Sequence, residues 1–310
     1  MPELPEVAGL SSFLGTHLEG TVLTKLQVLS VAVLKTASPP YTALEGRAVT
    51  GVRRFGKFVS IDADGLHFVF HLARAGWVRY TESPAAAPAA KATAGQATAR
   101  QPPPGQGMLR PGKGPIAARL AFAGEDGMHI GIDLTEAGTK KSLAVYVVHD
   151  PQDVPGIAAL GPDPLDPGFS PAKFAGLLAA SHHQIKGVLR SQSVIAGIGN
   201  AYSDEILHAA RISPYAMADS LDEETVRVLY DAIHSVLGAA VEEATGKAPG
   251  DLKDAKRGAM RVHGRAGLPC PVCGDTVREV SFADTSLQYC PTCQTNGKIL
   301  ADRRTSRFLK

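Results

Sequence analysis

Four cysteines form two C-x-x-C pairs near the end of the sequence, Cys270-Pro-Val-Cys273 and Cys290-Pro-Thr-Cys293, with sixteen residues between the pairs. Two such pairs at this distance supply four thiolates to a tetrahedral Zn²⁺, and in a reducing cytosol metal ligation is favoured over two disulfides. Because sulfur occupies all four ligand positions, we expect one structural zinc that holds a β-hairpin in shape and leaves no position for a substrate or water.

The sequence begins Met1-Pro2-Glu3, which places an imino acid beside a carboxylate. If Met1 is removed, Pro2 becomes a secondary amine at the start of a predicted helix, where the positive end of the helix dipole lowers the amine pKa from roughly 8. A neutral secondary amine can attack a sugar carbon, and Glu3 can act as a general acid or base. Many chains begin Met-Pro-Glu without catalytic meaning, so these residues alone leave the chemistry open.

A glycine-rich turn, Ala196-Gly-Ile-Gly-Asn200, precedes a predicted helix that begins near Asn200. Backbone N–H groups at a helix start can bind phosphate where small residues permit close approach, although packing of two helices across the glycines explains the same pattern. Lys57, in the basic turn Arg53-Arg-Phe-Gly-Lys57-Phe, suits a phosphate or a solvated turn equally.

Before residue 160 the pattern predicts mainly short strands. Residues 5–18 carry apolar side chains at helical spacing, and β-rich runs punctuated by glycines follow over residues 21–80. Residues 83–107 contain 17 Ala, Pro or Gly out of 25, which predicts a disordered insertion. Strand-like runs then resume, so the insertion lies inside an antiparallel β domain.

Helical patterns dominate beyond the proline-rich segment 162–171. Ser170 followed by a proline predicts an N-cap, Ile185 begins a second apolar helical pattern, and Ser220 with Glu223 predicts a capping box ahead of a longer helix. With 310 residues, of which 44% are hydrophobic, the chain is long enough for two domains and a small additional module.

Positive charge is concentrated at the C-terminal end. Residues 251–310 contain 11 Lys and Arg against 6 Asp and Glu, whereas residues 1–250 contain 21 against 24. A basic terminal module is expected for phosphate contact, and a solvated charged tail has the same composition. The sequence has no apolar run of 18 residues and no secretory signal pattern, so we expect a cytoplasmic protein with no membrane partner.

In chain order, MPELPEV, RRFGKF, GIGNAYSDEILHAARISP and CPVC…YCPTCQ resemble the formamidopyrimidine-DNA glycosylase/endonuclease VIII family over nearly the whole length. The resemblance implies an α+β multidomain fold and a monomer. Its expected parts are an N-terminal antiparallel β-sandwich with flanking helices (1–160, with a low-complexity insertion at 83–112), a helix-two-turns-helix DNA-binding domain (161–262), a zinc-finger β-hairpin (263–296) and a basic tail (297–310).

The resemblance also implies a bifunctional DNA glycosylase and abasic-site lyase of base excision repair, of bacterial type and associated with the nucleoid. Double-stranded DNA would bind with its damaged, oxidised nucleotide flipped out. Pro2 would attack C1′ to form a Schiff base, Glu3 would donate a proton, and β,δ-elimination would cut the strand. Lys57, Lys186 and Asn200 match the family's phosphate contacts.

Several positions depart from the family pattern. Thr285 stands where members usually carry an arginine on the zinc hairpin, and Arg74 stands where oxidised-purine enzymes insert a methionine. A second inserted turn is replaced by residues 136–142, and the stretch between Ala244 and Arg261 looks short for a loop that caps an oxidised purine.

The basic tail offers Arg303 and Arg304 as substitute cations for DNA. Retention of Pro2, Glu3 and Lys57 favours an enzyme, whereas the departures favour a DNA-damage binding protein with lyase activity but little base excision. A zinc-ribbon protein unrelated to repair would have no reason to share the N-terminal segment.

Overall fold

A computed structural model describes residues 1–84, 115–124, 127–137, 141–282 and 285–301. Almost all of the expected insertion at 83–112, and Arg303 and Arg304 in the tail, lie outside the described residues. The chain forms two compact units whose bounds do not follow chain order. Unit 1 contains Met1, Leu14–Arg53 and Ser60–Pro151, and unit 2 contains Pro2–Phe13, Arg54–Val59 and Gln152–Lys310.

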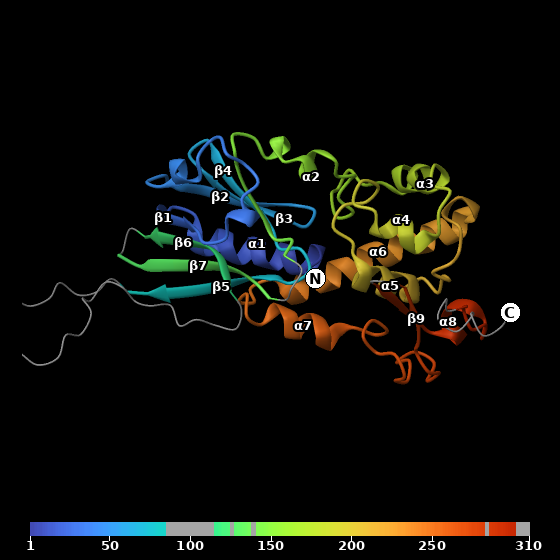
Figure 1. Ribbon diagram of the computed structural model, residues 1–310. Helices are drawn as coiled ribbons and strands as arrows, with labels where there is room; N and C mark the ends of the chain where they lie inside the picture. Colours follow the sequence, from blue (N-terminus) through green and yellow to red (C-terminus); the bar gives the residue numbers. More distant parts are fainter. Residues whose placement is uncertain (85–114, 125–126, 138–140, 283–284, 302–310) are drawn as a thin grey trace, which may run out of the picture. The chain divides into compact units, whose positions relative to one another are not determined.

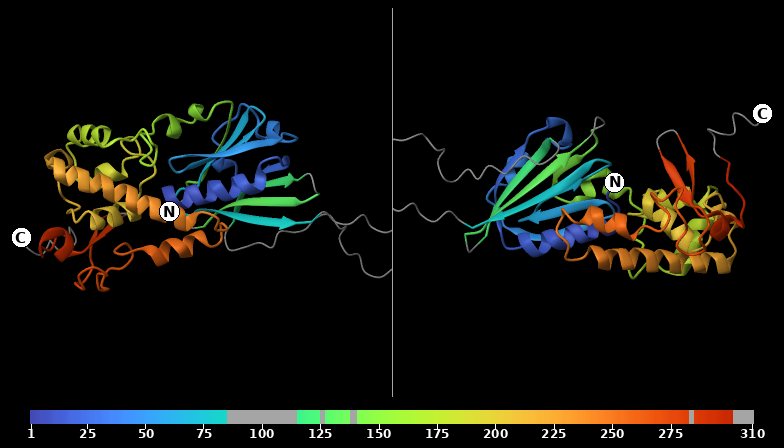
Figure 2. Two further views of the ribbon diagram at one scale, coloured as in Figure 1. Left: turned by 180° about the vertical axis from the view of Figure 1, so that it is seen from behind. Right: turned by 90° about the horizontal axis from the view of Figure 1, so that it is seen from below.

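Unit 1 is built on two four-stranded sheets, which form separate layers (Figures 1 and 2). One has the strand order β1-β6-β7-β5 and is antiparallel throughout, and the other has the order β2-β3-β4-β8. Apolar side chains such as Phe68, Phe122 and Ile132 are buried. The strands are β1 (Val22–Val28), β2 (Val49–Phe55), β3 (Phe58–Ala63), β4 (Leu66–His71), β5 (Gly76–Ser83), β6 (Ile116–Ala123), β7 (His129–Glu136) and β8 (Ala144–Val148).

Unit 2 is mainly helical and has its own apolar core, to which Phe174, Ile206 and Leu229 belong. Helix α1 and strands β2 and β3 contribute residues to both units. The helices are α1 (Leu4–Leu18), α2 (Pro155–Ala158), α3 (Pro171–Ala179), α4 (Ile185–Arg190), α5 (Asn200–Ala209), α6 (Glu223–Ala244), α7 (Leu252–Ala259) and α8 (Pro291–Thr295) (Figure 1). The mixed α+β class is confirmed, and no helix in the described ranges is long and apolar enough to cross a membrane.

Local signals located several helix starts correctly. Ser170 caps α3 through its side chain, which accepts a hydrogen bond from the N–H of Lys173, and α5 begins at Asn200. The predicted capping box at Ser220 is wrong. Asp222 is the N-cap of α6 and accepts from the N–H of Thr225 at 2.8 Å, because the residue between Ser220 and Asp222 is extended and leaves Ser220 outside the helix.

The predicted zinc hairpin is present in unit 2. Strands β9 (Arg278–Ser281) and β10 (Ser286–Tyr289) pair in antiparallel register, with Ser286 opposite Ser281, and α8 follows them (Figure 2, right). The amide of Gln294 on α8 donates to the carbonyl of Ile212 at 2.9 Å, which attaches the module to the segment after α5. This hydrogen bond therefore connects the zinc module to the helical part of unit 2.

Candidate functional site

Glu3 caps helix α5 with its side chain. Its Oε2 accepts hydrogen bonds from the backbone N–H groups of Gly199 at 2.7 Å and Tyr202 at 3.2 Å, and its Oε1 accepts from Ala201 at 2.9 Å. Glu3 is only 2% exposed, and Pro2 beside it is also buried, whereas Met1 is exposed. The structure thus fixes the predicted catalytic carboxylate on the positive end of a helix dipole.

The two glycines before α5 lie where a larger side chain would collide with the N-terminal segment. A Cβ atom on Gly199 would lie 2.4 Å from Cδ of Glu3, and one on Gly197, whose φ is +88°, would lie 2.7 Å from Cδ1 of Leu4. The backbone N–H groups at the start of α5 are therefore engaged by the chain's own carboxylate. The close packing of both glycines agrees with the packing alternative, and a phosphate contact of this turn stays a prediction.

A second carboxylate and a lysine complete this buried group. Oε2 of Glu6 accepts from the backbone N–H of Glu3 at 2.8 Å and from Nζ of Lys256 at 2.7 Å, while its Oε1 accepts from the Tyr202 hydroxyl at 2.7 Å. Nζ of Lys256 also lies 3.6 Å from Oε1 of Glu3. Sequence reasoning missed both Glu6 and Lys256, because neither stands in a motif that points to its partner.

The charge state of Glu3 follows from these neighbours. Burial alone would raise the pKa of Glu3, but the charges of Lys256 and Lys57 and the hydrogen bonds from α5 bring that pKa below its usual value. Glu3 is therefore an ionised carboxylate at neutral pH. In this state it accepts protons, so the expected role of proton donor requires that Glu3 first take up a proton during the reaction.

Lys57 is buried rather than solvated, with 7% of its surface exposed. It lies in the turn between β2 and β3, and its Nζ donates a hydrogen bond to the carbonyl of Ile198 at 2.8 Å. Burial lowers the pKa of Lys57 to about 8, against the charge of Glu3, which acts to raise it. Lys57 therefore lies beside the Glu3 group, and the reading of a solvated turn is wrong.

Replacing Lys57 by methionine is expected to stabilise the protein by about 1 to 3 kcal/mol at pH 7, since the difference between the ordinary pKa of 10.5 and about 8 corresponds to about 3 kcal/mol. The carbonyl of Ile198 keeps a second donor, the side-chain amide of Gln192 at 2.7 Å. Between pH 8 and 10.5 the folded protein binds fewer protons at this site than the unfolded chain, so the stability of the wild type rises with pH there.

Chemical denaturation of the wild type and Lys57→Met from pH 7 to pH 10.5 measures this effect. The advantage of the variant is expected to be largest at or below pH 8 and to shrink toward pH 10.5. Exposed Lys173 on α3 provides the control, because Lys173→Met removes a lysine from the surface and not from the interior. A Lys57→Met protein that is less stable than the wild type at pH 7 contradicts the assigned cost of burying this lysine.

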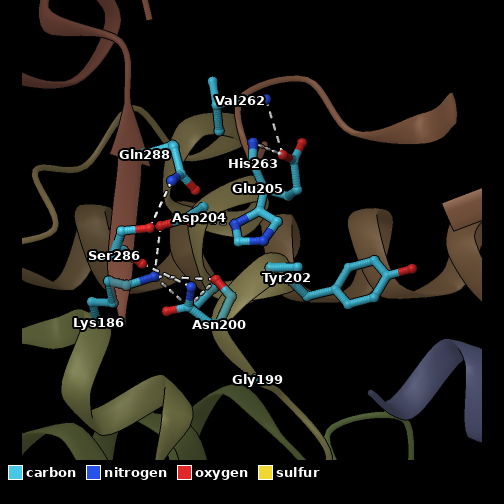
Figure 3. Close-up of polar contacts among 12 residues, drawn as sticks. Lys186, Gly199, Asn200, Tyr202, Asp204, Glu205, Val262, His263, Ser286 and Gln288 are labelled. Atoms are coloured by element: carbon cyan, nitrogen blue, oxygen red, sulfur yellow. Dashed lines mark hydrogen bonds and ion pairs between the residues drawn. The ribbon is translucent and has the colours of Figure 1, made fainter. Parts of the chain in front are cut away.

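Lys186 and Asn200, the two residues of this region that are expected to contact phosphate, lie together (Figure 3). Nζ of Lys186 donates to Asp204 Oδ1 at 2.6 Å, to Ser203 Oγ at 2.8 Å and to the carbonyl of Asn200 at 3.2 Å. The lysine is 5% exposed and its pKa is lowered by burial, which the charge of Asp204 opposes. The positive charge of Lys186 is thus balanced by a buried partner within the same helix pair.

Asn200 links α5 to the zinc hairpin, since its Nδ2 donates to the carbonyl of Ser286 on β10 at 2.8 Å (Figure 3). Its Oδ1 is buried without a hydrogen-bond partner among the described residues. In this structure both side chains make hydrogen bonds within unit 2. The phosphate contacts expected of Lys186 and Asn200 stay predictions.

Glu205 positions the segment that follows α7, a role that the sequence did not reveal. Its carboxylate accepts from three consecutive backbone N–H groups, those of Arg261 at 2.8 Å, Val262 at 3.0 Å and His263 at 2.8 Å. Figure 3 shows Glu205 beside Val262 and His263. Nδ1 of His263 lies 2.7 Å from the second oxygen of Asp204. Two adjacent acids of α5 therefore fix the path of the chain between α7 and the zinc hairpin.

The four cysteines form the predicted metal site. Their Sγ atoms all lie within 4.8 Å of one another, with Cys270 and Cys293 at 3.9 Å and Cys273 and Cys290 at 3.3 Å. A tetrahedral zinc with Zn–S bonds of about 2.3 Å separates its sulfurs by about 3.8 Å, so the set fits one Zn²⁺. The site is structural, because four thiolates fill the coordination sphere. Nε2 of His208 lies 3.3 Å from Sγ of Cys270, which joins α5 to the site.

The positions that depart from the family pattern have different surroundings. Arg74 is exposed in the turn between β4 and β5 of unit 1, and Thr285 precedes β10, where its carbonyl accepts from the N–H of Phe282. In the replaced turn, Glu136 accepts from the N–H groups of Ser142 and Leu143, and residues 138–140 lie outside the described ranges. The stretch between Ala244 and Arg261 is not simply a short loop, because it contains helix α7.

Comparison with known proteins found three family models that match parts of this chain. Family models match residues 1–103 (formamidopyrimidine-DNA glycosylase N-terminal domain), 160–249 (formamidopyrimidine-DNA glycosylase H2TH domain) and 267–296 (zinc finger found in FPG and IleRS). The formamidopyrimidine-DNA glycosylase of Symbiobacterium thermophilum is 31% identical over 98% of this chain and 93% of its own length. An uncharacterized formamidopyrimidine-DNA glycosylase-like protein of Mycobacterium tuberculosis is 61% identical over 49% of this chain and 95% of its own length.

Solved structures agree with these sequence matches. The MutM (Fpg) protein of Thermus thermophilus has a TM-score of 0.73 and 29% identity, with 94% of this chain and 98% of that chain covered. Lactococcus lactis Fpg in complex with abasic-site DNA has a TM-score of 0.75 and 23% identity, with 94% and 99% covered, and shares the fold.

Proposed function

The chain belongs to the formamidopyrimidine-DNA glycosylase family, and we propose that it is a DNA glycosylase of base excision repair that also cuts the strand at the resulting abasic site. Its substrate is double-stranded DNA with damaged, oxidised bases or abasic sites, such as the nucleoid offers. The observation that carries the proposal is the ionised, buried carboxylate of Glu3 at the start of α5, next to Pro2.

In the proposed reaction the mature chain lacks Met1, so that Pro2 carries a secondary amine. The amine nitrogen forms a bond to C1′ as the bond from C1′ to the base breaks, and Glu3 takes the proton that the nitrogen loses. Protonated Glu3 then returns this proton to O4′ as the sugar ring opens to the Schiff base. Loss of the protons at C2′ and C4′ expels the 3′ and 5′ phosphates in turn, which is β,δ-elimination.

The phosphate contacts in this proposal come from Lys57, Lys186 and Asn200. Lys57 lies near Glu3 and is a cation below a pH of about 8, where it can attract a phosphate next to the flipped nucleotide. Asn200 would exchange its bond to Ser286 for a phosphate oxygen. Arg303 and Arg304 remain proposed tail contacts outside the described residues.

A DNA-damage binding protein with lyase activity but little base excision is the second candidate. Two observations favour it, namely Thr285 in place of the hairpin arginine and Arg74 in place of an apolar inserted side chain. Flipping a paired base costs a few kcal/mol and is cheapest where pairing is already lost. The two candidates therefore differ in how fast a fully paired lesion is excised.

We expect strand cleavage at an abasic site to exceed excision of 8-oxoguanine from a paired duplex by at least about tenfold, if the missing contacts cost about 1.4 kcal/mol in the transition state. Arg74→Ala should lower excision more than abasic-site cleavage, because the arginine would contact the orphaned base or a phosphate. Single-turnover rates on matched duplexes measure both effects. Equal rates on the two duplexes would contradict this specificity, and a paired lesion left uncut with rapid abasic cleavage would favour the second candidate.

A further inference from the structure

We propose that Lys256 on α7 is a positioning residue of this site, whose ammonium group holds the ionised carboxylate of Glu3 beside that of Glu6. The claim that Lys256 holds the two carboxylates in place rests only on contacts within unit 2. The kinetic part rests on the proposed function, because it concerns the proton that Glu3 exchanges with Pro2.

The ammonium of Lys256 meets three groups at once. It donates to Oε2 of Glu6 at 2.7 Å, lies 3.6 Å from Oε1 of Glu3, and lies 4.7 Å from the ring centroid of Tyr202. The side chain of Lys256 is 17% exposed, and those of Glu3 and Glu6 are 3% and 4% exposed. A cation between two buried carboxylates and above an aromatic face is electrostatically favourable, because each partner is itself withdrawn from water.

Helix α7 presents this lysine inward. Leu252 is buried at its start and Met260 just beyond its end, whereas Lys253 and Arg257 are exposed. The segment after Met260 is fixed by its hydrogen bonds to Glu205. Lys256 is thus the basic residue of this short helix that contacts the carboxylates of the N-terminal segment.

The charge balance explains why a cation is needed here. The groups that face Glu3 are Glu6 on α1, Tyr202 and the backbone N–H groups on α5, Lys57 in the turn after β2 and Lys256 on α7, with Lys186 on α4 further away. Burial disfavours the ionised form of Glu3, so a nearby positive charge is needed to keep this carboxylate ionised. Lys256 is the largest of the charges that lower the pKa of Glu3, and that pKa should rise when the cation is removed.

The Tyr202 hydroxyl cannot replace Lys256. Burial, the charge of Glu6 and their hydrogen bond raise the pKa of Tyr202 well above its ordinary value, so it stays a neutral donor to Glu6. A neutral donor stabilises a carboxylate less than a cation does. Without Lys256 the pair would keep its geometry from α5 and Tyr202 but lose its nearest positive charge.

The test compares Lys256→Met with Lys256→Arg, which keeps the charge, and with Lys253→Met, which removes an exposed lysine from the same helix. ¹³C NMR titration of the Glu3 carboxyl, assigned with Glu3→Gln, is expected to show a rise of about one pH unit or more in Lys256→Met. Lys256→Arg should restore most of the original value, and Lys253→Met should leave it unchanged. Lys256→Gln serves as the neutral variant if the methionine variant does not fold.

Single-turnover cleavage of abasic-site DNA gives the kinetic readout. Because the reaction needs an ionised Glu3 as well as a neutral Pro2 amine, the rate falls first as Pro2 is protonated and falls more steeply once Glu3 is protonated. The pH at which this steeper fall begins should move upward in Lys256→Met by the same amount as the NMR titration, with an unchanged rate limit at high pH. A Glu3 carboxyl that titrates identically with and without Lys256 overturns the proposal, as does an equal loss of rate at every pH. If the wild type has no lyase activity, the proposed function fails, while the NMR titration still decides the role of Lys256.

Discussion

Replacement of Glu3 by glutamine is expected to lower the single-turnover rate of strand cleavage at abasic sites by at least about a hundredfold. Glutamine has the size of glutamate but cannot take up the proton of the Pro2 amine. Its amide also presents N–H groups where the N–H of Ala201 or of Gly199 now meets a carboxylate oxygen. The variant should therefore cleave the strand much more slowly. The start of α5 should also become less stable.

The stability loss has a defined pH dependence. The pKa of Glu3 is lowered in the folded protein, so the ionised carboxylate contributes stability above the unfolded value of 4.5, and this contribution is lost as pH falls through the folded pKa. Glu3→Gln should be less stable than the wild type at pH 7, with the difference shrinking in acid. Thermal unfolding and DNA affinity measured on the same sample separate the two effects. A folded Glu3→Gln protein that cleaves within threefold of the wild-type rate would remove Glu3 from the proposed mechanism.

Loss of the zinc should weaken DNA binding by at least about tenfold while it leaves bond breaking at saturating enzyme largely intact. Apparent binding free energies of structural zinc are about 10 to 16 kcal/mol, so Cys290→Ser should unfold the hairpin locally. The carbonyl of Ser286 would then no longer hold the side-chain amide of Asn200, and the contact of His208 with Cys270 would be lost.

The matched control for this prediction is Val272→Ala, because Val272 lies between two ligands, is 50% exposed and binds no metal. Elemental analysis should give one zinc per chain for the wild type and the control. Titration of fluorescently labelled abasic-site duplex then measures affinity. If the Cys290→Ser variant lacks zinc and still binds this duplex as tightly as the wild type, the account of the hairpin is wrong.

Patterns of neighbouring residues were sufficient to predict those features that depend on interactions within a short stretch of the chain. The Ser170 cap, the helix start at Asn200 and the four-cysteine site all follow from residues close together in sequence. Ser220 shows the limit of such patterns, since two capping residues stood two positions apart and the backbone of the intervening residue selected Asp222.

The buried group around Glu3 could not be predicted in this way. The hydrogen bond from Gly199 to Glu3 joins residues 196 positions apart, and the contact of Lys256 with Glu6 joins residues 250 apart. Lys57 likewise looked like an exposed turn lysine, because its burial depends on Ile198. These pairings arise only when the N-terminal segment, the turn after β2 and α7 are folded into one unit.

The most direct test of the central claim is reduction with borohydride during the reaction with abasic-site DNA, followed by mass mapping of the protein and DNA adduct. Only an imine is reduced to a stable amine bond, so the account predicts one covalent adduct, located on the nitrogen of Pro2 in chains that lack Met1. Absence of an adduct, an adduct on a lysine, or retention of Met1 in active protein would contradict the assignment of Pro2 as the nucleophile.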